Sequence, residues 1–250
     1  MVGNQSVTES DFHENGYAGP YPLVTPTEAE SLGKLISREF ERNQFRPLRA
    51  GRNRHLDLAP IAALCRQPTL VDTASAVLGR NLLLWRTQMF FQVRERALPW
   101  HQDLFNNLLD DSSVNISVHI AITAATETNC MTVIPGSHRM DCSVFGLSQE
   151  KGPSPNAYGN QRFIQNGSEP PEKKMILAPG QFFIFDSRLI HRTCCLADAD
   201  PRVAFVLRLT TPAVRVRPEA FGEMPKAHHS AVLLSGEDRY RLNQLGSMPA

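Results

Sequence analysis

The chain has 250 residues, 42% of them hydrophobic, and a formal net charge of +1. We expect one domain over 1–250, and the evenly spread basic residues argue against a nucleic-acid-binding face. No apolar stretch approaches the length of a membrane span, and the polar, acidic N-terminus does not resemble a secretory signal. The five cysteines match no zinc pattern and include adjacent Cys194 and Cys195, so we expect reduced thiols in a cytoplasmic protein.

Two helices are predicted in the first third of the chain, after a poorly ordered lead-in over residues 1–20. Residues 25–28 (Thr-Pro-Thr-Glu) form a capping box with proline at the first helical position. Apolar residues then recur at helical spacing at Leu32, Leu35, Ile36 and Phe40. A second helix is predicted from Pro68 to Leu78, with Gly79 at its end.

After Gly79 the hydrophobic pattern changes to a period of two, which is typical of β-strands. Strands are predicted at 81–93, 114–123, 130–134, 175–178, 181–186 and 203–210. In 114–123 the even-numbered residues are branched and apolar, from Val114 to Ile122, and share one face. Asn115, Ser117 and His119 share the other. One face should therefore pack on a core while the other meets something polar. Helices followed by many short strands predict a barrel or jelly roll braced by N-terminal helices.

Residues 141–173 are rich in Gly, Pro, Asn, Ser and Lys and show no periodicity. A loop of this length inside a compact domain is usually a lid, a binding loop or disordered. We expect a lid-like loop here.

The strongest candidate site combines His101, Asp103 and His191. Two imidazoles and one carboxylate can hold a first-row metal on one face, and these ligands suit Fe, Mn or Zn. His101 and Asp103 lie at i and i+2, so on a strand they would point to the same side. A lone histidine is usually a surface or core residue, so the argument rests on the three together.

Two arginines, Arg202 and Arg208, lie six apart on the last predicted strand and should share a face. They are either surface residues at strand ends or carboxylate ligands, for example for a dicarboxylate co-substrate. His119 is a third metal ligand, a co-substrate contact or a satisfied interior histidine, and the last two are favoured equally. Trp85 and Trp100 are expected to pack, and the pair at 228–229 to lie on the surface.

Three motifs carry a family resemblance: Trp100–Asp103, residues 129–139 with Pro-Gly-Ser-His, and residues 178–185 leading to His191. They resemble the phytanoyl-CoA dioxygenase-like iron(II)/2-oxoglutarate oxygenases over nearly the whole chain. Residues 54–57 and 84–87 are most similar to the syringomycin-type halogenase branch. Those halogenases have alanine or glycine in place of Asp103, which leaves room for chloride. The carboxylate here implies hydroxylation or another oxidation instead.

The resemblance implies a mainly β, double-stranded β-helix (cupin-like jelly roll) that uses Fe(II), 2-oxoglutarate as co-substrate and O2. It implies that the iron ligands are His101, Asp103 and His191. It further implies that Arg202 binds the distal carboxylate of 2-oxoglutarate, with Thr193, Gln88 and His119 beside the co-substrate and with Arg208 and Asn106 near the substrate.

The implied function is hydroxylation of an unactivated C–H bond in secondary metabolism. The substrate would be a small metabolite or an acyl or aminoacyl group tethered to a carrier protein, with no nucleic-acid or membrane partner. The same cofactors also support desaturation, cyclisation or epimerisation. A cupin-like metal enzyme without 2-oxoglutarate would leave Arg202 without an obvious role. A non-catalytic ligand-binding barrel would predict a broken triad, whereas this one is intact.

Overall fold

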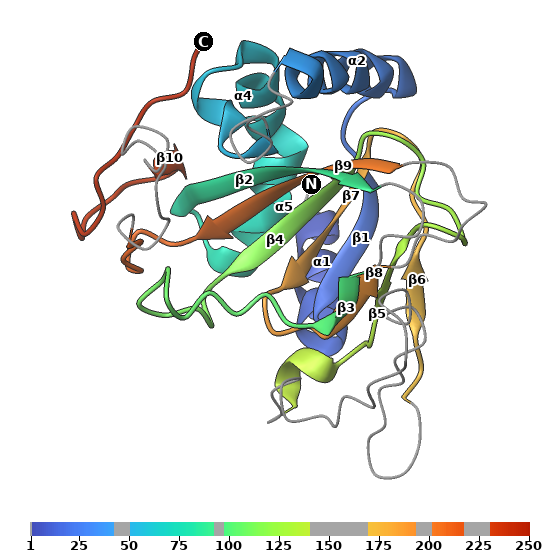
Figure 1. Cartoon of the computed structure of the whole chain (residues 1–250). Helices are drawn as coiled ribbons and strands as arrows, with labels where there is room; N and C mark the ends of the chain where they lie inside the picture. The colour runs from blue at the N-terminus through green and yellow to red at the C-terminus, as the bar shows by residue number, and fades with distance from the viewer. Residues whose placement is uncertain (1, 43–50, 93–97, 141–169, 194–201, 218–230) are drawn as a thin grey trace.

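The computed structural model describes residues 2–42, 51–92, 98–140, 170–193, 202–217 and 231–250 (Figure 1). These residues form two antiparallel sheets. The six-stranded sheet has the order β1 (Tyr17–Pro22), β7 (Gln181–Asp186), β4 (Ile116–Ala121), β9 (Arg202–Thr210), β2 (Leu82–Gln92) and β10 (Val232–Ser235). The four-stranded sheet has the order β3 (Leu98–His101), β8 (His191–Thr193), β5 (Met131–Val133) and β6 (Lys173–Met175). The predicted mainly β jelly roll with N-terminal helices is confirmed.

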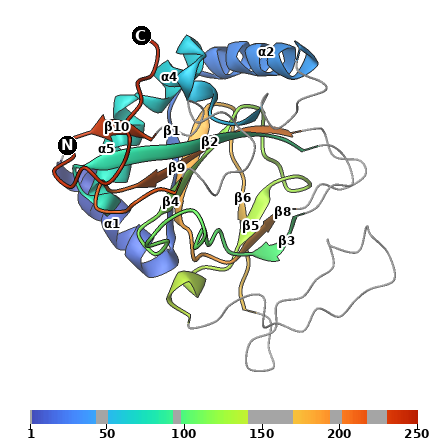
Figure 2. The ribbon, with the colours of Figure 1, turned by 60° about the vertical axis from the view of Figure 1, so that its left-hand side comes forward.

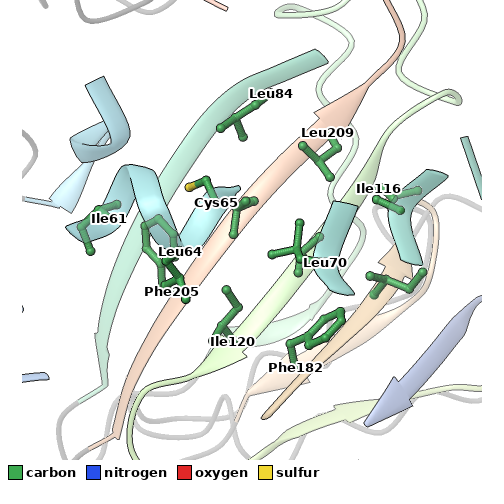
Figure 3. Packing of buried hydrophobic residues seen from close by; sticks show 14 of the residues in the cluster. Ile61, Leu64, Cys65, Leu70, Leu84, Ile116, Ile120, Phe182, Phe205 and Leu209 are labelled. Atoms are coloured by element: carbon green, nitrogen blue, oxygen red, sulfur yellow. The ribbon is translucent and has the colours of Figure 1, made fainter. Parts of the chain in front are cut away.

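Helices cover the face of the six-stranded sheet that points away from the four-stranded one (Figure 2). They are α1 (Val2–Asn15), α2 (Pro26–Arg42), α4 (Ala59–Cys65) and α5 (Pro68–Leu78). Two short 3-10 turns also occur, η1 (Arg54–Leu56) before α4 and η2 (Ser137–Arg139) after β5. Ile61, Leu64, Leu70 and other apolar helix residues pack on Leu84, Phe205 and neighbouring strand residues (Figure 3). No helix among the described residues is long and apolar enough to cross a membrane.

The predicted signals for helix ends are confirmed for α2 and α5. The Glu28 backbone N–H donates to the Thr25 hydroxyl (3.3 Å), and the Thr25 N–H donates to the Glu28 carboxylate (2.8 Å). This reciprocal pair satisfies two donors at the start of α2. Helix α5 begins at Pro68 and ends at Leu78, and Gly79 follows with a φ of +83°, a left-handed conformation that favours glycine.

Alternation along β4 and β9 decides which side chains face the second sheet. Ile116, Val118 and Ile120 of β4 belong to the helix-covered core, so Ser117 and His119 point to the other face. Likewise Val203, Phe205 and the later odd-numbered residues of β9 face the helices. Arg202 and Arg208 therefore lie on the inner face, and both are buried. They are not surface residues at strand ends.

The prediction of a poorly ordered lead-in over residues 1–20 is wrong. Residues 2–15 form α1 and β1 begins at Tyr17. Helix α1 packs beside α5, and the Phe12 side chain enters the core. The helix is therefore supported by tertiary contacts, and its polar sequence carries no helical stripe that would have revealed it.

Two further predictions shift. The strand predicted at 175–178 is β6 at Lys173–Met175, after which Leu177 makes an isolated bridge to Ala125. Helix α4 was not predicted. Of the expected lid-like loop at 141–173, residues 141–169 lie outside the described residues, and its last residue already belongs to β6. Of the cysteines, Cys65 and Cys130 are free and buried, as expected of reduced thiols.

Candidate active site

The candidate metal ligands meet where β3 and β8 pair in the four-stranded sheet. His101 and His191 are direct partners in this pairing, with ring centroids 4.1 Å apart. Asp103 lies beyond the end of β3, so the strand geometry expected for residues 101 and 103 does not hold. Instead, the Asp103 backbone N–H donates to the Ser187 carbonyl (2.8 Å), in the turn that leads to His191. This hydrogen bond places the carboxylate beside the two rings.

The three side chains present their ligand atoms to a common point. The distance from His101 Nε2 to Asp103 Oδ1 is 3.9 Å, and from His191 Nε2 to Asp103 Oδ2 it is 3.7 Å. The ligand atoms all lie within 4.8 Å of one another. Metal–ligand bonds of roughly 2.0–2.2 Å can join atoms this close through one ion. The donor set and its spacing therefore fit a single metal.

Backbone carbonyls fix the tautomers of both histidines. His101 Nδ1 lies 2.7 Å from the Pro99 carbonyl, and His191 Nδ1 lies 2.8 Å from the Leu189 carbonyl. A carbonyl oxygen only accepts, so each Nδ1 carries the proton and donates. Each Nε2 therefore keeps a lone pair directed at the common point, which is the usual arrangement of a metal-binding histidine.

Electrostatics keep Asp103 and His191 in the protonation states that a metal requires. Burial alone would raise the pKa of Asp103, but the charges of Arg208, His191 and His101 outweigh it and lower the pKa to about 2. Burial, followed by the charge of His101, lowers the pKa of His191 to about 3. At neutral pH the carboxylate is thus ionised and the His191 ring neutral, as ligation demands.

Arg208 lies at the candidate metal centre itself. One of its terminal nitrogens donates to the Asp103 carboxylate and to the Ser117 hydroxyl. Its guanidinium lies 4.8 Å from the centre of the Phe105 ring. The arginine side chain is only 7% exposed, so the pair with Asp103 is a buried one.

Arg202 and His119 form a second buried pair on the same inner face. Arg202 Nη1 lies 3.1 Å from His119 Nε2, and both residues are buried. A guanidinium only donates, so Nε2 accepts and the His119 proton is on Nδ1. Burial, followed by the charge of Arg202, holds the pKa of His119 well below its ordinary value. Among the described residues, His119 is not part of the group that could hold a metal.

The remaining predicted site residues are Gln88, Thr193 and Asn106. Gln88 is half-buried on β2 opposite Val206, and its amide oxygen accepts from Arg86 (2.9 Å). Thr193 is buried on β8, two residues after His191 and on the same side of the strand. Asn106 is exposed, and its amide oxygen accepts a hydrogen bond from the Ser112 hydroxyl. None of its described contacts is with a metal ligand.

Both tryptophans have packing contacts, as predicted. Trp85 is buried and donates to Asn115 (2.8 Å), and Trp100 lies under the guanidinium of Arg192 (4.5 Å). The histidine pair at 228–229 lies outside the described residues.

Sequence reasoning missed Ser117, Arg86 and Phe105. The first two had a detectable signal, because Ser117 shares a strand face with His119 and Arg86 shares one with Gln88. Phe105 follows the metal-ligand motif in a loop, where no periodicity exists to place its ring.

The chain belongs to the phytanoyl-CoA dioxygenase (PhyH) family, whose model matches residues 12–194. No curated protein matches the chain. Among solved structures, the nickel complex of ThoJ, a non-heme monooxygenase, is 21% identical, with a TM-score of 0.73 over 97% of this chain and 89% of that one. CytC3 with Fe(II) and alpha-ketoglutarate is 22% identical, with a TM-score of 0.71 over 96% and 92%.

The epimerase SnoN, in complex with Fe3+, alpha-ketoglutarate and nogalamycin RO, is 16% identical, with a TM-score of 0.69 over 99% and 97% of the two chains. At these identities the three structures establish a shared fold. They do not place the chain in the halogenase branch, and that assignment stays a prediction.

Proposed function

We propose that this protein is an iron(II)- and 2-oxoglutarate-dependent dioxygenase that hydroxylates an unactivated C–H bond. Membership in the PhyH family supports the class of enzyme. The observation that carries the proposal is that a candidate metal site and a buried arginine site lie on the same side of the large sheet. The triad of His101, Asp103 and His191 lies beside a buried inner face on which Arg202 and His119 are paired.

The triad would hold Fe(II) through two neutral Nε2 atoms and one ionised carboxylate. Three protein ligands leave three of six positions for other groups, which is the arrangement of non-haem iron oxygenases. Bound iron with 2-oxoglutarate and dioxygen supplies the oxidising chemistry, whereas the chain supplies position, charge and exclusion of water. The depressed pKa values of Asp103 and His191 mean that neither ligand has to lose a proton at neutral pH when the metal binds.

Arg202 would bind the distal carboxylate of 2-oxoglutarate. A buried guanidinium needs an anion, and its planar fork matches a carboxylate with two parallel hydrogen bonds. His119 would orient this guanidinium by accepting from it. Gln88 and Thr193 would flank the co-substrate, and Arg208 and Asn106 would lie toward the substrate. CytC3 and SnoN were solved with iron and alpha-ketoglutarate, which supports the same pair for this fold.

Hydroxylation is the outcome that Asp103 favours over halogenation. When iron is bound, the Asp103 carboxylate would occupy the coordination position that a halide would need. The substrate would be a small metabolite or a carrier-tethered acyl or aminoacyl group of secondary metabolism. Desaturation, cyclisation and epimerisation use the same cofactors, so the product has to be identified directly.

The test is an anaerobic titration of the purified protein with Fe(II) and then 2-oxoglutarate. We expect the visible absorption band of an iron(II)–2-oxoglutarate chelate, with about one co-substrate per chain. Candidate metabolites are then added, and a true substrate should shift the band. Iron binding without any band on addition of 2-oxoglutarate would favour the cupin-like alternative and contradict the proposal.

A further inference from the structure

A side chain replaces a backbone group where the pairing of β5 with β8 ends. Val133 and His191 are the last partners in this pairing. One residue further on, the Ile134 N–H donates to the Ile190 carbonyl (3.0 Å). Two residues that face each other in this way in an antiparallel pair normally exchange both hydrogen bonds. Here the return bond from the Ile190 N–H goes to the Ser137 hydroxyl oxygen (2.9 Å) instead of the Ile134 carbonyl.

The turn over residues 135–137 explains this exchange. Pro135 has no N–H with which to continue the ladder, and Gly136 has a φ of +77°, which allows the chain to reverse. The Ser137 N–H then donates to the Ile134 carbonyl (3.2 Å), and the Ser137 hydroxyl becomes the acceptor for Ile190. Both Ser137 and Ile190 are fully buried, so solvent does not reach this hydrogen bond.

The Ile190 N–H belongs to the same peptide group as the Leu189 carbonyl, and that carbonyl accepts from His191 Nδ1 (2.8 Å). A peptide group is planar and stiff, so the direction of its N–H fixes the direction of its C=O. Ser137 therefore acts on His191 through one rigid unit. The hydroxyl oxygen holds one end of the Leu189–Ile190 peptide, and the imidazole is held at the other end.

This chain of hydrogen bonds affects the electronic state of the His191 ring as well as its position. Hydrogen bonds in series polarise one another. A bond from the Ile190 N–H to Ser137 makes the Leu189 carbonyl a stronger acceptor, and this strengthens its bond to His191 Nδ1. A stronger bond at Nδ1 raises the basicity of Nε2, which is the atom directed at the metal.

The N-terminal segment holds the turn and the peptide in place. The Asn15 carbonyl accepts from the Gly136 N–H (2.8 Å). Gly16 packs so closely that a Cβ there would lie 2.8 Å from Leu189 Cδ1, and its φ of +79° also favours glycine. The support of the Ser137 hydroxyl is therefore rigid on the side that faces away from the metal ligands.

We propose that Ser137 is a positioning residue for His191. Its hydroxyl sets the orientation of the Leu189–Ile190 peptide and, through that peptide, the orientation and basicity of the imidazole. The inference rests on the part of the proposed function that makes His191 a metal ligand. It gives the Pro-Gly-Ser segment at 135–137 a role in the metal site, although none of its residues belongs to the ligand set.

The first test uses metal-free protein and nuclear magnetic resonance of ¹⁵N-labelled histidine rings. The variants are Ser137→Ala, which removes the acceptor, Ser137→Cys, which keeps a similar shape with a weak acceptor, and Ser137→Thr, which keeps the hydroxyl. We expect the ring nitrogens of His191 to shift in the Ala and Cys variants and to stay close to wild type in the Thr variant. The ring nitrogens of His101, which bonds to a different carbonyl, should not move in any of them.

The second test is an anaerobic titration of the same proteins with Co(II), which binds to the same kinds of ligand as Fe(II) and has its own visible absorption. Loss of an outer hydrogen-bond partner typically weakens metal binding 10–100-fold. We expect a loss of about tenfold or more in Ser137→Ala and Ser137→Cys, and recovery in Ser137→Thr. Thr87→Ala is the matched control, because it removes a buried hydroxyl that is paired with His55 (2.9 Å), not with a metal ligand.

Unchanged His191 shifts in the Ala or Cys variant, or equal shifts in His101, would overturn the proposal. So would a loss of Co(II) affinity in Thr87→Ala as large as in Ser137→Cys, because general destabilisation would then explain both. The Cys variant decides the question if Ser137→Ala does not fold. A shifted His191 ring in a protein that binds no metal would support the contact from Ser137 and contradict the proposed function. An iron(II)–2-oxoglutarate band in wild type, with the His191 ring indifferent to Ser137, would do the reverse.

Discussion

The two sheets contribute to the site in different ways. The six-stranded sheet has strands of up to 11 residues and a helix-covered core, and its inner face carries the arginines and His119. The four-stranded sheet has strands of three or four residues, yet it carries both metal-ligand histidines. Its opposite face bears ion pairs such as Arg192 with Glu172 (2.8 Å) and Lys174 with Glu127 (2.6 Å).

This difference suggests a division of labour. The large sheet supplies stability and fixed charges, because its core is deep and its strands long. The small sheet and the segment after β3 supply the metal ligands. The Nδ1–H groups of the two histidines donate to the Pro99 and Leu189 carbonyls, and the Asp103 backbone N–H donates to the Ser187 carbonyl. Changes in the large sheet's supports should therefore alter stability without altering metal binding, and changes among the metal ligands should do the opposite. Asp103 is a candidate metal ligand and also accepts a hydrogen bond from Arg208 of the large sheet, so its substitution should alter both stability and metal binding.

The largest effect is expected for Asp103→Gly. Hydroxylation of the metabolite found by band shift should be mostly lost, some succinate release should persist, and chlorination should be weak or absent because the C–H bond is not placed for it. Removal of the carboxylate also leaves Arg208 buried without its partner, so the free energy of unfolding of metal-free protein should fall by about 3–5 kcal/mol.

The assays for this variant are product mass spectrometry with chloride present and denaturant unfolding. Asp110→Gly is the control, because its ion pair with Arg217 is exposed and worth about 0–1 kcal/mol. An Asp103→Gly protein that hydroxylates at the wild-type rate would show that Asp103 is not an iron ligand.

Next in size is the effect of Arg202→Lys on co-substrate binding. Lysine keeps the charge but not the fork, and loss of a charge-assisted bond costs about 1.5–3 kcal/mol. The dissociation constant for 2-oxoglutarate should rise accordingly in anaerobic titrations followed by the visible band. Arg208→Lys should instead weaken mainly the binding of the substrate that is oxidised. The opposite pattern would mean that the roles of the two arginines are exchanged.

Much of this arrangement could be predicted from the sequence, and the limits are physical. Strict alternation over 114–123 marked β4 at Ile116–Ala121, and Pro68 with Gly79 marked both ends of α5. Spacing alone could not show that Arg208 contacts Asp103, because 105 residues separate them and only the packing of two sheets brings them together. Nor could a strand rule place Asp103, which a hydrogen bond to Ser187 positions outside the strand.

A smaller effect is expected on the pH dependence of the free energy of unfolding, and it comes from His55, which lies beside β2 of the large sheet. Burial lowers the pKa of His55 to about 3, and its Nδ1 lies 2.9 Å from the Thr87 hydroxyl. Below about pH 6.5 His55 binds a proton in the unfolded chain but stays neutral in the folded chain. The free energy of unfolding therefore falls as the pH falls toward 3. The contribution approaches about 1.4 kcal/mol per pH unit.

Denaturant unfolding of wild type and His55→Gln between pH 7.5 and 4.5 measures this slope, and the variant should show a shallower one. Exposed His13→Gln is the control. Equal slopes in wild type and His55→Gln would mean that the folded protein protonates His55 as readily as the unfolded chain.

The smallest expected effect is that of Thr25→Ala at the start of α2. Loss of the capping pair with Glu28 should lower the free energy of unfolding by about 1 kcal/mol. The affinity for iron should not change, because the described contacts of α2 lie on the helix-covered side of the large sheet, away from the metal ligands. A weakened metal site in this variant would contradict the division between the two sheets.

The most direct test of the central claim is an anaerobic Fe(II) titration of wild type, His101→Ala and His191→Ala, with His13→Ala as the control. We expect about one Fe(II) per chain in wild type and in the control. Each ligand variant should lose more affinity than the 10–100-fold typical of an outer hydrogen-bond partner, while its unfolding curve stays close to that of wild type. Unchanged affinity in both His101→Ala and His191→Ala would show that this triad does not bind the metal.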